Sequence, residues 1–110
     1  MELNIREYKR ANVVRVTGRV DASVAPKFEE ALQQQVEGGH AHLILEMDGT
    51  DYISSAGVRA LISAQKALKA KGGAVLLAQP SSRVKEVLDI AGLDALFQTF
   101  ADTEAALGSV

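Results

Sequence analysis

Two neighbouring hydroxyl groups open the stretch Ser54-Ser55-Ala56-Gly57, which predicts the first turn of a helix. Serine is favoured at a helix N-cap, where its side-chain oxygen accepts a hydrogen bond from a free backbone N–H group. A serine beside Gly57 also has a small, open surround that the active site of another protein could approach. A phosphate here would meet free N–H groups and the positive end of the helix dipole, with Arg59 one turn away. The stretch therefore fits either a helix cap or a phosphorylation site.

Three carboxylates lie in loops that precede expected helices. Asp21 ends the turn Gly18-Arg19-Val20-Asp21, and Asp48 and Asp51 lie in the loop before Ser54. Aspartate side chains readily accept hydrogen bonds from nearby backbone N–H groups. We interpret Asp48 and Asp51 as carboxylates that shape their loop. For Asp21 two roles are open, a contact with a partner protein and a hydrogen bond within its own loop.

Composition excludes several classes of protein. The 110 residues include no cysteine and two histidines, and they carry a net charge of -2. Disulfide scaffolds, zinc ribbons and thiol catalysis are therefore ruled out, and so is nucleic-acid binding through bulk positive charge. The first residues contain no apolar core of a signal peptide, and the longest strongly apolar run is too short to cross a membrane. We expect a soluble cytoplasmic protein that needs no metal ion and no cofactor and binds neither nucleic acid nor membrane.

Strands and helices are expected to alternate after an N-terminal hairpin. Alternation of apolar and polar residues predicts the hairpin, with Gly18 ending its second strand. Two short runs that are almost entirely apolar predict strands buried on both faces. Ser23 is a plausible N-cap for the first helix, with Pro26 in its first turn. Asp102 is a plausible N-cap for the last helix. The expected strands are 3–6, 14–17, 43–47, 74–78 and 96–100, residues 50–53 form a loop, and the helices span about 23–37, 55–71, 80–91 and 102–107.

This order predicts one α/β domain over residues 1–110. Strands that alternate with helices give right-handed crossovers and a mostly parallel sheet, and the leading hairpin makes that sheet mixed. The helices would pack against the sheet. Binding sites in such folds lie in the loops that leave the carboxyl ends of the strands. The loops 18–21 and 48–57 are therefore the candidate positions for function.

The chain resembles the STAS-domain anti-sigma factor antagonists. The resemblance is carried by the element order and by the runs Gly18-Arg19-Val20-Asp21, Tyr52-Ile53-Ser54-Ser55-Ala56-Gly57-Val58 and Val87-Leu88-Asp89-Ile90-Ala91-Gly92-Leu93. It implies a STAS-type fold and a binding module that is not an enzyme. In that family an anti-sigma factor, which is also a serine kinase, phosphorylates one serine of the antagonist. The unphosphorylated antagonist binds the kinase and frees a sigma factor, and a phosphatase reverses the modification.

The resemblance assigns site residues one by one. The family's usual run is Asp-Ser-Ser/Thr-Gly, with the serine after Asp as the phosphoacceptor. Ser55 takes the acceptor position and Gly57 the glycine, while Ser54 replaces the acidic residue and is an alternative acceptor. Asp21 matches the acidic residue after the second strand. We expect Asp21, Ser54, Ser55, Gly57 and Arg59 to contact the partner, and the chain to be a monomer.

Three other functions compete with this one. A hydrolase would need a Gly-x-Ser-x-Gly turn, and His40 and His42 are expected at the opposite end of the central strand from Ser55. A response-regulator receiver would use Asp48 as its phosphoacceptor, but it also needs a lysine after the last strand, and residues 86–110 contain none. A STAS scaffold or small-ligand module that is never phosphorylated stays open, because Ser54 replaces the family's aspartate.

Overall fold

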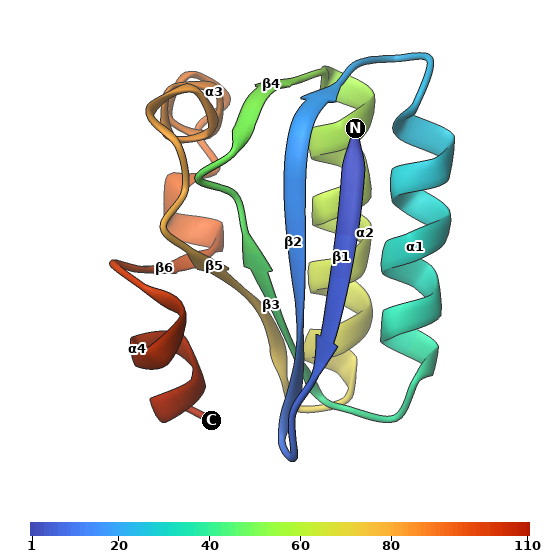
Figure 1. The fold of residues 1–110 in the computed structure, drawn as a ribbon, viewed down its shortest axis with the longest axis vertical. Coiled ribbons are helices and arrows are strands. Elements are labelled where there is room, and N and C mark those ends of the chain that lie inside the picture. Colours follow the sequence, from blue (N-terminus) through green and yellow to red (C-terminus); the bar gives the residue numbers. More distant parts are fainter.

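One six-stranded sheet organises the protein in a computed structural model that describes residues 1–110 (Figure 1). The strands are β1 (Glu2–Glu7), β2 (Ala11–Val20), β3 (His42–Glu46), β4 (Thr50–Ile53), β5 (Ala74–Ala78) and β6 (Gln98–Phe100). The main path runs β1-β2-β3-β5-β6, and β4 pairs with β2. Only the β1–β2 pair is antiparallel. The predicted mixed, mostly parallel sheet with an N-terminal hairpin is therefore confirmed.

Four helices cover the sheet. They are α1 (Ala25–Glu37), α2 (Ser55–Ala70), α3 (Ser82–Ile90) and α4 (Thr103–Gly108), and a short 3-10 helix spans Asp94–Leu96. Helices α1 and α2 lie side by side against one face of the sheet, and α4 lies beside β6 on the other side of the molecule (Figure 1). None of the helices is long and apolar enough to cross a membrane.

The core has two parts because the central strands are buried on both faces. Leu45 and Leu77 point to the larger cluster, which includes Phe28 of α1 and Leu61 of α2. Residues one position earlier point the other way, into a smaller cluster under α4 that consists of Ala11, Val13, Ile44, Leu76, Ala78 and Ala106. Alternate side chains leave a strand on opposite faces, so burial on both sides explains why β3 and β5 consist almost entirely of apolar residues.

A buried carboxylate marks the end of β3. Glu46 is only 4% exposed and accepts two hydrogen bonds from the Arg6 guanidinium of β1, at 2.9 and 2.7 Å. The hydroxyl of Thr103, at the start of α4, donates a third. The hydrogen bonds from Arg6 lower the pKa of Glu46 below its ordinary value, against the effect of burial. Glu46 thus ties the edge strand and the last helix to the centre of the sheet.

The second strand does not end at Gly18, contrary to the sequence expectation. Gly18 has φ +93°, and the register between β2 and β4 shifts between Gly18 and Arg19. Glycine adopts positive φ without steric cost and so absorbs a bulge. The strand therefore bends and continues to Val20, pairing first with β3 and then with β4.

Residues 50–53, expected to be a loop, form the short strand β4. Thr50 and Ile53 are buried while Asp51 is exposed, and the Thr50 hydroxyl donates to the carbonyl oxygen of Val16 at 2.8 Å. Four residues that include an aspartate give too weak a pattern to predict a strand. The strand forms because its backbone pairs with the bent end of β2. The chain therefore contains one strand more than the sequence predicted.

The first helix begins differently from the expectation. Its N-cap is Val24, not Ser23, and no side chain caps the helix. The aspartate before it orders the turn that leads into the helix. The Asp21 carboxylate accepts from the backbone N–H groups of Ser23 and Val24 at 3.0 and 3.3 Å, and from the Ser23 hydroxyl at 2.6 Å. The predicted Pro26 in the first turn and the Asp102 N-cap of α4 are confirmed.

Candidate functional site

The two candidate loops meet where β2 and β4 end together. Val20 and Ile53 are paired in the parallel register, and the backbone N–H of Ser54 donates to the carbonyl oxygen of Val20 at 2.8 Å. Asp21 and Ser54 therefore leave the sheet at the same edge, one toward α1 and the other toward α2. The fold brings the predicted loops 18–21 and 48–57 together.

Ser54 is the N-cap of α2. Its backbone is extended, and its Oγ accepts a hydrogen bond from the N–H of Gly57 at 3.2 Å. The residue is only 8% exposed. Its hydroxyl is therefore engaged in helix capping and turned away from solvent.

Ser55 is the first residue of α2 and is exposed. Its side chain takes no part in the cap, and it lines a groove between α2 and α3. Of the two serines predicted as acceptors, Ser55 alone presents its hydroxyl at the surface. The different exposures of Ser54 and Ser55 could not be read from two adjacent serines in the sequence.

Gly57 lets α2 begin close to the sheet. The residue is buried, and a Cβ atom at this position would lie 2.8 Å from Cγ1 of Ile53 and 3.0 Å from Cγ1 of Val20. Both of these side chains belong to the core. Gly57 therefore sets the position of the Ser54–Ser55 turn by close packing, and its predicted contact with a partner stays a prediction.

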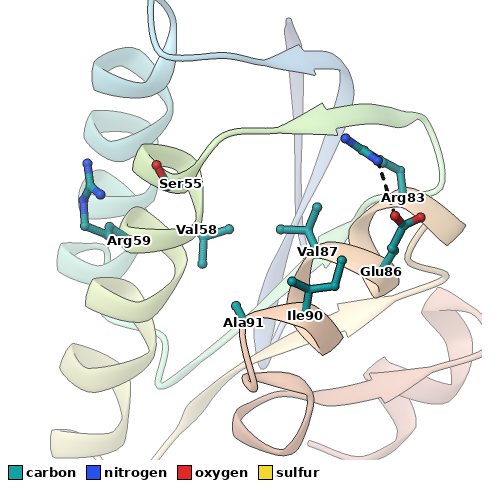
Figure 2. A pocket seen from close by; sticks show the side chains of 8 residues that line it. All are labelled: Ser55, Val58, Arg59, Arg83, Glu86, Val87, Ile90 and Ala91. Atoms are coloured by element: carbon teal, nitrogen blue, oxygen red, sulfur yellow. Dashed lines mark ion pairs between the residues drawn. The ribbon is translucent and has the colours of Figure 1, made fainter.

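The α2–α3 groove has a cavity volume of about 390 Å³ and a largely apolar wall. Val58 of α2 faces Val87 and Ile90 of α3 across it, and Ala91 lies at its end (Figure 2). Ile90 is 79% exposed. This surface was not predicted from the sequence. The one indication of it was Ile90, which falls outside the spacing of the buried residues of α3.

Both walls of the groove are attached to β4. Helix α2 follows β4 directly, through Ser54. Helix α3 is held through Ser81, whose hydroxyl donates to the carbonyl oxygen of Thr50 at 2.7 Å and accepts from the N–H of Val84 at 3.2 Å. One short strand thereby positions Ser55 and the apolar wall opposite it.

Comparison with known proteins assigns the chain to a family. The STAS domain model matches residues 2–106. The chain belongs to the STAS domain family. The protein BtrV of Bordetella bronchiseptica is 30% identical over 106 residues, which cover 96% of this chain and 91% of BtrV. The anti-sigma-B factor antagonist of Bacillus subtilis is 25% identical over 107 residues, 97% of each chain. An anti-sigma factor antagonist function is supported by these relatives.

A solved structure confirms the fold of this STAS domain. SpoIIAA, a Bacillus cell fate determinant, superposes in its phosphorylated form with a TM-score of 0.78 and 20% sequence identity. The superposition covers 98% of both chains. The STAS-type α/β fold predicted from the sequence is therefore shown over nearly the whole chain.

Two arginines line the groove together with the exposed serine of the STAS domain. Arg59, one turn from Ser55 on α2, is exposed, lines the groove and forms no ion pair. Arg83 lies 3.6 Å from Glu86 on α3. Its guanidinium is also 5.8 Å from the centre of the Tyr52 ring, and Arg19 lies 4.6 Å from the centre of the same ring. Arg59 is thus the one charged residue of the groove without an ion pair, and its side chain extends from α2 away from α3 (Figure 2).

Of the candidate carboxylates, Asp21 is the one with hydrogen bonds within its own loop. The hydrogen bond from the Ser23 hydroxyl lowers the pKa of Asp21, so this carboxylate stays charged. Asp48 accepts from Arg15 at 2.7 Å and lines a separate cavity with Gln79, not the α2–α3 groove. Asp51 is exposed on β4. The ion pair of Asp48 joins its loop to β2, and the expected loop-shaping roles of Asp48 and Asp51 stay predictions.

The histidines lie away from the serines. His42 is the first residue of β3, at the amino end of a strand that runs parallel to β2 and β4. No group of three His, Asp or Glu side chains is arranged to hold a metal ion. The charged side chains that line the groove with Ser55 are Arg59 and the ion pair of Arg83 with Glu86.

Proposed function

We propose that this STAS domain is a phosphorylation-controlled anti-sigma factor antagonist. In its unphosphorylated form it binds an anti-sigma factor that is also a serine kinase, and this binding releases a sigma factor. Phosphorylation of Ser55 ends the binding, and a serine phosphatase restores it. The observation that carries the proposal is the exposed Ser55 beside the α2–α3 groove, next to a Ser54 that is buried and occupied by capping.

The start of α2 can hold a phosphate without changing its fold. The first N–H groups of a helix have no partner within the helix, and the helix dipole favours negative charge at this end. Only the N–H of Gly57 is used by the Ser54 cap. Arg59 lies at the i+4 position from Ser55, where helical side chains are neighbours. The phosphorylated form of SpoIIAA, which shares this fold, supports the proposal.

The added charge is large enough to act as a switch. A phosphoserine carries roughly -1.5 to -2 charges at neutral pH. Against one acidic group of the partner about 6 Å away, each unit of charge costs about 3 kcal/mol at an effective dielectric constant near 20. Even after screening, the affinity falls on the order of a hundredfold. The phosphate can therefore block binding without moving the backbone.

The proposal gives the domain no catalytic step of its own. Its hydroxyl is the substrate of the kinase, and the phosphatase acts on the resulting phosphoserine. Because the kinase uses ATP, we place this exchange in the cytoplasm.

Capture followed by site mapping tests the proposal. Wild type, Ser55→Ala and Ser55→Asp are used as baits in a lysate of the native host, and a captured serine kinase is identified by mass spectrometry and purified. With ATP it should label wild type and Ser54→Ala but not Ser55→Ala, and Ser55→Asp should bind it on the order of a hundredfold more weakly. Label on Ser54, or unchanged binding of Ser55→Asp, would contradict the proposal.

A second candidate is a STAS scaffold or small-ligand module that is never phosphorylated. It is favoured by Ser54, which stands where the family's phosphorylated members carry aspartate and so removes a negative charge beside the acceptor. If all three baits capture the same set of proteins, or none captures a kinase, the scaffold replaces the switch.

A further inference from the structure

The outer edge of β1 is free to pair with another strand. β1 lies at the edge of the sheet and pairs only with β2, in a register that no bulge or proline interrupts. The N–H of Tyr8 donates to the carbonyl oxygen of Ala11 at 3.1 Å, and this bond sets which residues alternate in bonding to β2. The N–H and C=O groups of Leu3 and Ile5 therefore point away from β2. Such an edge can bind an added strand.

The two faces of β1 carry different side chains. Leu3 packs against the larger core cluster, and Ile5, on the same face, is 46% exposed. Glu2, Asn4 and Arg6 alternate with them and point to the other face. A strand added at this edge would cover the exposed apolar side chain on one face and would meet one acid and one base on the other.

We infer that β1 pairs antiparallel with β1 of a second copy of this chain, centred on Asn4. In this register Glu2 of each copy lies opposite Arg6 of the other, and Leu3 lies opposite Ile5. The same surface serves both copies, as a two-fold axis requires. Leu3 and Ile5 exchange main-chain hydrogen bonds, while the charged residues form non-hydrogen-bonded pairs, whose side chains lie closer together. Opposite charges and apolar pairs in facing positions both stabilise a sheet.

Other registers lose this match. A shift by one residue sets side chains of opposite faces against each other. A shift by two residues in one direction places Leu3 opposite Glu7. The same shift in the other direction places Glu2 opposite Asn4 and leaves Arg6 beyond the end of the partner strand. The self-complementary pattern of β1 therefore specifies one register.

Arg6 can bind a second carboxylate while it holds Glu46. An arginine side chain has five N–H donors. Arg6 uses three of them, two in its hydrogen bonds to Glu46 and one in a bond to the Tyr8 hydroxyl. Its side chain is 38% exposed. Two donors are therefore left for Glu2 of the second copy.

The dimer goes beyond the proposed function and does not depend on it. β4, which leads into Ser55, pairs with β2 on the side away from β1, so both copies keep this serine accessible. A contact between two six-residue strands is smaller than a standard interface, and we expect a Kd on the order of 0.1 mM. The monomer expected from the sequence is then the form at low concentration, and the dimer presents two acceptor serines on one continuous sheet.

Sedimentation equilibrium of matched variants tests the inference at about 10 μM to 1 mM, where mass action shifts a weak dimer. Glu2→Arg sets two arginines opposite each other and should raise Kd at least tenfold. Glu104→Arg, the same charge change on an exposed residue of α4, should stay within about threefold of wild type. Ile5→Pro removes an N–H that β2 does not use, so it should abolish the dimer and leave the circular dichroism spectrum unchanged.

Amide hydrogen exchange locates the interface. The N–H groups of Leu3 and Ile5 should exchange severalfold more slowly at about 1 mM than at about 10 μM, because only the dimer bonds them. A wild-type monomer at 1 mM would overturn the inference. So would equal weakening by Glu2→Arg and Glu104→Arg, or a dimer in which these two amides exchange at an unchanged rate. None of these measurements involves a kinase, so their failure is distinct from failure of the proposed function.

Discussion

Replacing Ser54 by alanine removes the hydroxyl that caps α2, whereas the same change at Ser55 removes a hydroxyl that the fold does not use. The Ser54 Oγ accepts from the N–H of Gly57 at 3.2 Å in a site that is 8% exposed. Loss of an N-cap costs about 1 kcal/mol, and the buried N–H left without a partner brings the total to about 1–2 kcal/mol. Ser55 is exposed, so Ser55→Ala should change the free energy of unfolding by about 0.5 kcal/mol or less.

Urea unfolding followed by circular dichroism measures both changes. We expect a lower midpoint for Ser54→Ala with an unchanged slope, and a melting temperature lower by about 4–8 °C for a domain of this size. Ser54→Asp is the matched control, because aspartate is also a good N-cap and its charge suits this end of a helix. That variant should retain most of the stability.

The refuting result is a loss for Ser55→Ala as large as that for Ser54→Ala. The N-cap of α2 would then not depend on the Ser54 hydroxyl, and that hydroxyl would be free to accept a phosphate. A kinase that labels a single serine would be expected to choose it. The stability measurement therefore tests the assignment of the acceptor without any partner protein.

Two further predictions concern the packing that supports the site. Glu46→Gln should lower the free energy of unfolding by about 2 kcal/mol near neutral pH, because it weakens the charged hydrogen bonds from Arg6. The folded-state pKa of Glu46 is lowered. Its contribution is therefore complete above about pH 5, and the difference from wild type should vanish as pH falls through the folded-state value. Asp48→Asn removes an exposed ion pair and should cost less than about 1 kcal/mol. Equal losses for Glu46→Gln and Asp48→Asn would contradict the larger contribution assigned to the buried Glu46. Gly57→Ala should lower the melting temperature, because its Cβ meets Ile53 at 2.8 Å and overpacking of about 1–3 kcal/mol exceeds the gain of about 1 kcal/mol in helix propensity. A higher melting temperature for Gly57→Ala would contradict this prediction, because it would show that the side chains of Ile53 and Val20 move to accommodate the added Cβ.

The regular part of the fold was predictable because its residues repeat a local pattern. The apolar runs of β3 and β5 and the spacing of Phe28, Leu32 and Val36 on α1 indicate buried faces directly. A helix N-cap is predictable in the same way when one side chain forms it with a nearby N–H group, as Asp102 does for α4. These features depend on neighbours in the sequence, so the sequence alone contains them.

The elements that were missed depend on contacts between distant residues. β4 forms because the bend at Gly18 brings the end of β2 beside residues 50–53. The N-cap of α1 is Val24 rather than Ser23 because the Asp21 carboxylate binds the Ser23 hydroxyl and the N–H groups of the turn after β2. The α2–α3 groove requires two helices that are 11 residues apart in the chain to face one another. No local pattern specifies these relations.

The attachment of both groove walls to β4 has a consequence for the speed of partner exchange. Because the Ser54 cap and the Ser81 hydroxyl hold α2 and α3 to the same strand, the kinase of the proposed function would meet a surface that is already formed. Association with such a surface is fast, at about 10⁵–10⁷ M⁻¹ s⁻¹, and affinity changes are expressed mainly in dissociation. At about 10⁶ M⁻¹ s⁻¹, a complex with a Kd of about 1 μM lasts about a second, and a hundredfold loss of affinity shortens this to about ten milliseconds. Modification of Ser55 would then control how long the kinase is held rather than how quickly it is found.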